Sequence, residues 1–352
     1  MKKNIAVLPG DGIGPEIIQE AVKVLDAVAK AYDHEFDYTY ADVGAIAIDK
    51  TGSPLPEATL KASLESDAVL FGAIGDPKYD NDPNAKVRPE QGLLAIRKAL
   101  GLFCNIRPVK TFDALLHKSP LKEARVKGTD FEMYRELTGG IYFGEKKLSD
   151  DKNTASDLCQ YTRAEIERIA HKAFAAARKR RNVLTLVDKA NVLESSRLWR
   201  RVVTAMHQEI YSDVELRYLF VDNAAMQMIL APNQFDVMLT SNLFGDIISD
   251  EGSVIGGSIG LLPSASVGET HALFEPIHGS FPQGAGKGIA NPIAMILSAA
   301  MMLTHFDMDK EATAVRAAVD LALAKGVCTP EVFPENNYAT SDVGDFIANN
   351  IA

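Results

Sequence analysis

The stretch Phe235-Asp-Val-Met-Leu-Thr240, followed by Asn242-Leu-Phe-Gly-Asp-Ile-Ile-Ser-Asp250, joins an apolar run to a helical pattern. The apolar run predicts a buried strand that ends in a turn. On the helix that follows, Asp246 and Asp250 are four residues apart and share one face. Two stacked carboxylates repel each other, so they indicate either a solvated acidic face or a site for a hard divalent cation such as Mg²⁺ or Mn²⁺. The strand before them and the glycine-rich run 252–260 after them favour the metal site.

Strand and helix signals alternate along the rest of the chain. They predict strands at 4–8, 68–71, 183–187, 216–221 and 237–240, and helices at 15–32, 92–100, 164–181 and 191–209. This alternation is typical of an α/β protein with mainly parallel sheets flanked by helices. Residues 130–150 interrupt it with Thr138-Gly-Gly140 between two β-prone runs, which predicts a strand pair or a protruding arm.

Composition argues against several classes of protein. The chain has 352 residues, enough for two domains, and its net charge of −10 argues against a nucleic-acid-binding surface. Cys104, Cys159 and Cys328 are far apart, which predicts reduced thiols rather than a disulfide frame or a zinc site. The apolar run before Pro9 is too brief for a signal peptide, and the longest one, 293–303, is too short to span a bilayer. We therefore expect a soluble, cytoplasmic protein.

Three arginines are candidates for binding an anionic substrate. Arg97 follows Leu93-Leu-Ala-Ile96, Arg107 directly precedes Pro108, and Arg135 lies shortly before the Gly-Gly turn. Arginine offers a planar fork that grips a carboxylate with two hydrogen bonds. Each of the three taken alone is also compatible with a surface position or an internal salt bridge.

Lys189 and Tyr142 are candidates for proton transfer. Lys189 follows the apolar run Leu184-Thr-Leu-Val187, at the expected carboxyl end of a strand, where ligand crevices of open α/β sheets lie. A lysine that loses part of its hydration at such a position can act as a base. Tyr142 follows the Gly139-Gly140 turn and can donate a proton. A lysine that extends to solvent and a tyrosine that only packs remain the alternatives.

Two glycine-rich segments are candidates for binding a nucleotide. Gly10-Asp-Gly-Ile-Gly14 has the spacing G-x-G-x-G rather than G-x-G-x-x-G, so it is a weak dinucleotide motif. The segment 278–292, His-Gly-Ser-Phe-Pro-Gln-Gly-Ala-Gly-Lys-Gly-Ile-Ala-Asn-Pro, leads directly into an apolar helix. Backbone amides at a helix start bind phosphate, which favours this segment over an ordinary surface loop.

Together these segments resemble the isocitrate/isopropylmalate dehydrogenase family of β-decarboxylating dehydrogenases. The resemblance extends nearly from end to end of the chain. It is carried by Leu8-Pro-Gly-Asp-Gly-Ile-Gly-Pro-Glu16, Arg88-Pro-Glu-Gln-Gly-Leu-Leu94, Arg135-Glu-Leu-Thr-Gly-Gly-Ile-Tyr-Phe-Gly144, Val187-Asp-Lys-Ala-Asn-Val192, Asn242 to Asp250 and His278 to Pro292.

The resemblance implies a role for each candidate residue. Arg97, Arg107 and Arg135 match the arginines that hold the substrate's carboxylates. Asp246 and Asp250 match metal ligands, which an aspartate of the partner subunit, here Asp222, completes; the metal is Mg²⁺ or Mn²⁺. Lys189 matches the base and also reaches across the homodimer, whereas Tyr142 matches the acid.

The resemblance also implies two domains and a cofactor site. The first domain comprises residues 1–102 and 257–352, and the second comprises 103–256, which includes the arm at about 130–150 and makes the dimer. NAD lies along the loops 77–90 and 279–291 rather than on a standard Rossmann site. The implied cofactor contacts are Pro77, Glu90, His278, Gly279, Ser280, Gln283 and Asn291. Gln283 departs from the family, because NAD-dependent members usually carry an aspartate there.

Substrate choice within the family depends on the segment around Leu93 and Leu94. An isopropyl group needs apolar contact, whereas the γ-carboxylate of isocitrate needs a polar partner, so two leucines favour 3-isopropylmalate, in leucine biosynthesis. A D-malate, tartrate or isocitrate-type dehydrogenase is the alternative enzyme. A non-catalytic regulatory subunit is the alternative of another class, but such subunits lose a metal aspartate, the lysine or the tyrosine, and all of these are present.

Overall fold

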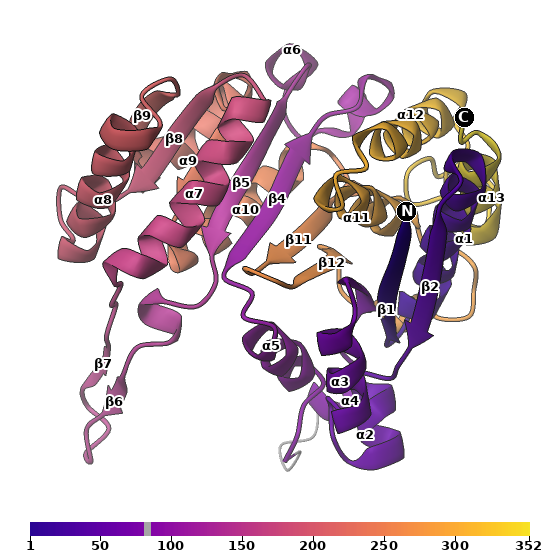
Figure 1. Ribbon diagram of the computed structural model, residues 1–352, viewed down its shortest axis with the longest axis horizontal. Helices are drawn as coiled ribbons and strands as arrows, with labels where there is room; N and C mark the ends of the chain where they lie inside the picture. Colours follow the sequence, from indigo (N-terminus) through magenta and orange to yellow (C-terminus); the bar gives the residue numbers. More distant parts are fainter. Residues whose placement is uncertain (81–85) are drawn as a thin grey trace. The chain divides into compact units, whose positions relative to one another are not determined.

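The computed structural model describes residues 1–80 and 86–352 (Figure 1). The chain folds into two compact units, each with strands and helices. The first consists of Met1–Leu102 and Ser258–Ala352, and the second consists of Phe103–Gly257. Both have the α/β architecture that the alternating pattern predicts.

The first unit contributes five strands to a sheet, in the order β2-β1-β3-β12-β11. All neighbouring pairs are parallel except β11 with β12. Its strands are β1 (Lys2–Gly10), β2 (Glu35–Tyr40), β3 (Ala68–Ala73), β11 (Pro263–Val267) and β12 (Ala272–Pro276). Its helices are α1 (Gly14–Tyr32), α2 (Ala45–Thr51), α3 (Glu57–Glu65), α4 (Pro77–Asp80), α5 (Glu90–Ala99), α11 (Ile293–His305), α12 (Asp309–Lys325) and α13 (Thr340–Asn349).

Helices cover both faces of this sheet. Helices α1 and α11 pack together against one face, and α12 and α13 lie against them (Figure 1). The apolar run at 293–303, which is too short for a membrane span, forms the buried helix α11. On the other face, Ile96 and Leu100 around the end of α5 pack with Leu8 and Phe71. Strands covered on both faces must be apolar throughout, which explains the continuous run in β1.

The second unit contributes five strands to a sheet, in the order β4-β5-β10-β8-β9. Only β4 and β5 are antiparallel in it. The strands of this unit are β4 (Cys104–Lys110), β5 (Asp130–Glu136), β6 (Lys146–Leu148), β7 (Ala155–Asp157), β8 (Val183–Asp188), β9 (Glu215–Phe220) and β10 (Val237–Thr240). Its helices are α6 (Glu123–Val126), α7 (Arg163–Lys179), α8 (Glu194–Ile210), α9 (Val221–Leu230) and α10 (Asn242–Ile255).

The side chains of strand β10 contribute to two hydrophobic cores. Successive side chains of a strand point to opposite faces of the sheet. Val237 and Leu239 accordingly join the core under α7 and α8, whereas Met238 joins the core under α9 and α10. Helix α10 begins immediately after the strand, at the carboxyl edge of this sheet, and packs back along the sheet with Ile248 and Ile255 in the second core.

The expected arm at 130–150 is wrong over its first part. Residues Asp130–Glu136 form β5, which pairs with both β4 and β10 inside the sheet. The arm is instead the antiparallel pair β6–β7, which projects from the rest of this unit (Figure 1). The alternation of charged and apolar residues in β5 resembles an exposed hairpin, but the strand is mostly buried because its charged side chains have partners. Glu136, with a fully buried side chain, pairs with Arg168.

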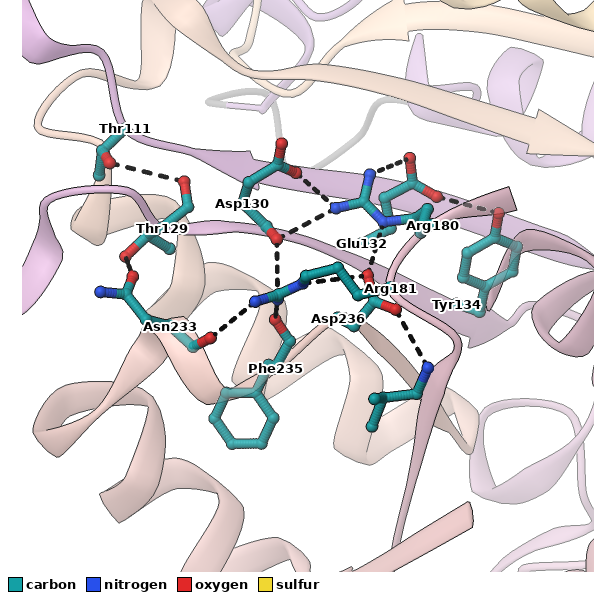
Figure 2. Close-up of polar contacts among 11 residues, drawn as sticks. Thr111, Thr129, Asp130, Glu132, Tyr134, Arg180, Arg181, Asn233, Phe235 and Asp236 are labelled. Carbon is teal, nitrogen blue, oxygen red and sulfur yellow. Dashed lines mark hydrogen bonds and ion pairs between the residues drawn. The ribbon is translucent and has the colours of Figure 1, made fainter. Parts of the chain in front are cut away.

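Arginines that follow α7 bind carboxylates at the amino-terminal edge of this sheet (Figure 2). Arg180 binds Asp130 at 2.5 Å, Glu132 at 3.2 Å and the buried Asp236 at 3.0 Å. Arg181 lies 3.6 Å from the same Asp236 carboxylate. This basic cluster therefore has carboxylates of its own chain as partners, and it lies at the opposite edge of the sheet from Asn242, where α10 begins.

Two further sequence expectations concern cysteines and membranes. All three cysteines are free, with Cys104 and Cys328 buried and Cys159 exposed. Among the helices of residues 1–80 and 86–352, none combines the length and the apolar character needed to cross a membrane.

Candidate active site

The two aspartates of α10 are surrounded by the candidate arginines and tyrosine of the second unit. The guanidinium of Arg135 donates to Asp246, and the hydroxyl of Tyr142 donates to the other oxygen of the same carboxylate at 2.7 Å. Arg107 donates from Nη1 to Asp250 at 2.9 Å. The side chains of Asp246 and Asp250 remain 38 % and 72 % exposed, so both are open to a ligand. Five of the predicted residues thus lie together on and around α10.

The environment of Tyr142 suits a proton donor. Partial burial and the hydrogen bond to Asp246 raise the pKa of Tyr142 above its ordinary value, because a neighbouring carboxylate disfavours the phenolate. The hydroxyl therefore keeps its proton at neutral pH. Arg135 is buried, and this burial lowers the pKa of its guanidinium, while Asp246 opposes the shift.

Local backbone geometry places Tyr142 and Arg135. Strand β5 ends at Glu136, whose carboxylate accepts from the backbone N–H groups of Thr138 and Gly139. Gly140 follows with φ +77°, a conformation that favours glycine, and opens the short 3-10 turn that carries Tyr142.

Lys189 lies directly after β8, at the carboxyl end of the strand, as predicted. Its ammonium is 2.8 Å from the carboxylate of Asp222 in the first turn of α9. This pairing lowers the pKa of Asp222. Asp222 is 66 % exposed and Lys189 is 25 % exposed. The predicted base and the third predicted metal ligand therefore form a second cluster in the same unit.

The predicted metal ligands do not form a complete site within one chain. In residues 1–80 and 86–352, no group of three or more His, Cys, Asp and Glu side chains has a metal-binding arrangement. Asp246 and Asp250 nevertheless provide exposed carboxylate oxygens one helical turn apart, which is the donor type that Mg²⁺ and Mn²⁺ prefer.

The first unit carries the remaining substrate candidates on α5. Arg97 donates from Nη2 to the buried Glu275 of β12 at 2.5 Å, so one edge of its guanidinium is held by protein. Leu94 is 60 % exposed, whereas Leu93 packs partly against the core. Of the two leucines, Leu94 is thus the one free to contact a ligand.

The glycine-rich segment 278–292 is held by Glu16 of α1. The carboxylate of Glu16 accepts from the backbone N–H groups of Gly286 and Gly288. Sequence reasoning missed this role, because a glutamate in a first helical turn is favourable on dipole grounds alone. The carbonyl of Ser280 accepts from the N–H of Ile13, which ties the segment to the β1–α1 turn.

His278 presents an acceptor without a protein partner. Its Nδ1 lies 2.9 Å from the carbonyl of Gly279, which can only accept, so Nδ1 carries the proton. Burial lowers the pKa of His278, which keeps the ring neutral. Nε2 is therefore a buried acceptor, and it has no hydrogen-bond partner among the described residues. This atom fits a ligand that donates a hydrogen bond.

The other cofactor candidates differ in their exposure and in the hydrogen bonds they already make. Gln283 and Gly279 are exposed, and Ser280 is buried. Asn291 is buried and already bonded, since it donates to Glu331 at 3.0 Å and accepts from the N–H of Ile293. In the loop 77–90, Pro77 begins α4 and Glu90 begins α5, while positions 81–85 of this predicted cofactor loop lie outside the described residues.

The weak motif at 10–14 has a structural role. The buried carboxylate of Asp11 accepts from the backbone N–H groups of Ala45, Ile46 and Gly75 at 2.9–3.0 Å. A Cβ on Gly12 would lie 2.0 Å from the carbonyl oxygen of Ser280, so glycine is needed for the close approach. This motif therefore supports the segment 278–292.

Residues 4–347 match the family described as isocitrate/isopropylmalate dehydrogenase, and the chain belongs to this family. Among its relatives, the 3-isopropylmalate dehydrogenase of Bacteroides fragilis is 57 % identical, covering 100 % of this chain and 99 % of the relative. That of Aquifex aeolicus is 54 % identical, covering 100 % and 98 %. A crystal structure of a β-decarboxylating dehydrogenase from Thermococcus kodakarensis is 38 % identical with a TM-score of 0.84, covering 99 % and 96 %. A crystal structure of isocitrate dehydrogenase from Methylococcus capsulatus is 33 % identical with a TM-score of 0.86, covering 99 % of each chain.

Proposed function

We propose that this protein oxidatively decarboxylates 3-isopropylmalate to 4-methyl-2-oxopentanoate, with NAD as hydride acceptor and Mg²⁺ or Mn²⁺ as metal, in leucine biosynthesis in the cytoplasm. The observation that carries the proposal is the cluster of Arg135, Tyr142 and Asp246, with Asp250 one helical turn further. It combines a cation for a carboxylate, a protonated acid and two open metal ligands. The relatives named 3-isopropylmalate dehydrogenase support the choice of substrate.

Each residue then has a defined task. Arg107 and Arg135, with Arg97, bind the substrate's two carboxylates, and Lys189 removes the proton of its 2-hydroxyl. When bound, the divalent cation would lower the pKa of that hydroxyl and NAD would take up the hydride from C2. Loss of CO₂ leaves an enolate, to whose carbon Tyr142 donates the proton.

The cofactor is proposed to lie along the segment 278–292. Three observations support this placement. His278 Nε2 is an acceptor without a partner among the described residues, and the side chain of Gln283 is exposed. In addition, the Glu16 carboxylate accepts from the backbone of the segment. The acceptor suits an exocyclic amine, which the adenine of NAD carries.

A homodimer is proposed to complete each site, with Lys189 and Asp222 acting in the site of the partner. Neighbouring helices α9 and α10 carry large apolar side chains that solvent still reaches. These are Met226, Ile229 and Leu230 on α9, and Ile247 and Val254 on α10. Apolar patches of this kind mark protein interfaces. Asp222, Asp246 and Asp250 belong to the same two helices, so a contact through these faces brings metal ligands of two chains near each other.

One assay tests the proposed function. NAD⁺ reduction is followed with 3-isopropylmalate, D-malate and isocitrate, each with and without EDTA. We expect the highest kcat/KM with 3-isopropylmalate and loss of turnover in EDTA. A higher value with D-malate or isocitrate would reassign the substrate, and metal binding without turnover on any of the three would indicate a regulatory subunit.

Cofactor choice is expected to depend on Gln283. An aspartate at this position accepts from both adenine-ribose hydroxyls and repels the 2′-phosphate of NADP, whereas glutamine lacks the charge. No arginine occurs in 278–292 to bind that phosphate. We therefore expect a preference for NAD that Gln283→Asp widens by about 5–30-fold, mostly through KM for NADP. The measurement is kcat/KM for both cofactors in both proteins, and an NADP preference in the native enzyme would contradict it.

Removing the Glu16 carboxylate, which holds the segment 278–292 in place, is expected to weaken NAD binding. Glu16→Ala loses the acceptors for Gly286 and Gly288, so the segment must be ordered on binding. We expect KM for NAD to rise by about tenfold, with KM for 3-isopropylmalate changed much less. Glu16→Gln retains one acceptor oxygen and serves as the matched control, with a smaller rise. Equal changes in both KM values would instead indicate a general loss of structure.

A further inference from the structure

Asn242, the first residue of α10, holds one edge of the Arg135 guanidinium. Its side chain is 1 % exposed. The carbonyl oxygen Oδ1 accepts from Nε of Arg135 at 3.1 Å and from Nη2 at 2.9 Å. Nδ2 donates to the carbonyl of Gly139 at 3.2 Å. The orientation of the amide follows from its partners, because a guanidinium only donates and a carbonyl only accepts.

Asn242 is itself held in place. Its backbone N–H donates to the hydroxyl of the buried Tyr161 at 2.9 Å. A Cβ on Gly140 would lie 2.3 Å from that hydroxyl, so the Gly-Gly turn presses against the tyrosine. A Cβ on Gly245 would lie 2.6 Å from Cγ of Arg135, so α10 packs directly on the arginine stem.

These contacts leave one way for a carboxylate to reach Arg135. A guanidinium offers two bidentate edges, Nε with Nη2 and Nη1 with Nη2. Asn242 covers the first edge, and Asp246 accepts one hydrogen of Nη1. One N–H on Nη1 and one on Nη2 remain, and the one on Nη2 is at the Nη1–Nη2 end.

We propose that Asn242 is a positioning residue that directs the substrate carboxylate to the Nη1–Nη2 end of Arg135 and thereby fixes where the rest of the substrate lies. The inference rests on the proposed function, in which Arg135 binds a malate carboxylate. Because one anchored carboxylate sets the position of the substituent on the neighbouring carbon, Asn242 contributes to the choice between 3-isopropylmalate and D-malate.

Asn242→Ala opens the Nε–Nη2 edge of Arg135 and is the principal test. We expect KM for 3-isopropylmalate to rise by about tenfold, and the kcat/KM ratio of 3-isopropylmalate over D-malate to fall. In an Arg135→Lys background, which has no bidentate edge, the same substitution is expected to change KM by less than about twofold. Equal effects of Asn242→Ala in both backgrounds would show a merely structural role and overturn the proposal.

Two further measurements keep the test decisive. Asn242→Asp retains an acceptor for Arg135. Its negative charge should weaken the binding of both substrates, but the kcat/KM ratio of 3-isopropylmalate over D-malate should stay near the native value. A large fall of this ratio would contradict the proposal. This variant also serves if Asn242→Ala folds poorly. Calorimetric binding of the two dicarboxylates needs no turnover, so it decides the role of Asn242 even if the native protein reduced NAD⁺ with none of the substrates, a result that would overturn the proposed function alone.

Discussion

Lys189→Met is expected to lower kcat by about 10²–10⁴-fold while substrate binding changes little, because a general base acts mainly on the barrier. Lys189 directly follows β8, and its ammonium lies 2.8 Å from Asp222. Its side chain is only one quarter exposed, and methionine, which is unbranched and of similar length, fills most of the same space. The measurements are kcat from NAD⁺ reduction and the dissociation constant of 3-isopropylmalate by calorimetry.

The control for this variant is Lys189→Arg. Arginine keeps the positive charge beside Asp222 but does not deprotonate, so it should be nearly as inactive as methionine. Near-normal kcat in either variant would show that Lys189 is not the base. Full activity in the arginine variant alone would show that Lys189 acts through its charge.

Mixing inactive chains tests whether the sites are shared. If Lys189 acts in the partner's site, a hybrid of Lys189→Met with Asp246→Asn contains one site in which both residues are native. Random exchange of equal amounts should then restore about a quarter of the native activity, since half of the dimers are hybrids with one intact site of two. No recovery after exchange is verified by mass spectrometry would place both residues in the site of one chain.

Asp246→Asn and Asp250→Asn are each expected to raise the Mg²⁺ or Mn²⁺ concentration needed for activity by about 100-fold or more, since each removes a charged oxygen ligand. The two variants differ in their other contacts. Asp246 also accepts from Arg135 and Tyr142, whereas Asp250 accepts from Arg107. We therefore expect Asp246→Asn to have the lower kcat at saturating metal.

Metal titration by calorimetry, without substrate, separates these effects. The half-buried Asp76 provides a matched acidic control, because Asp76→Asn removes the same charge from the first unit rather than from α10. An unchanged metal affinity in both α10 variants would remove the metal role from this helix.

Local sequence was sufficient to predict the features that depend on a single helix or strand. The strand at 237–240 has the predicted bounds, because three consecutive apolar residues and a threonine fit a strand buried on both faces. The periods of the helix and of the strand were sufficient to predict that Asp246 and Asp250 share one helix and that Lys189 lies at a strand end. For the same reason the first part of the arm was predicted wrongly. The charged residues of β5 indicate exposure until their partners are known, and those partners, such as Arg168 and Arg180, are 30 to 50 residues away.

The sequence by itself determined the α/β class, the helix that carries the two aspartates and, through its motifs, the family. Only the tertiary structure decided which groups meet: Arg135 with Asn242, 107 residues apart, and Glu16 with Gly286, 270 residues apart. The physical reason is that helical and strand periods follow from neighbouring residues, whereas a hydrogen bond between distant residues forms only where packing of the sheets and helices brings its donor and acceptor to about 3 Å.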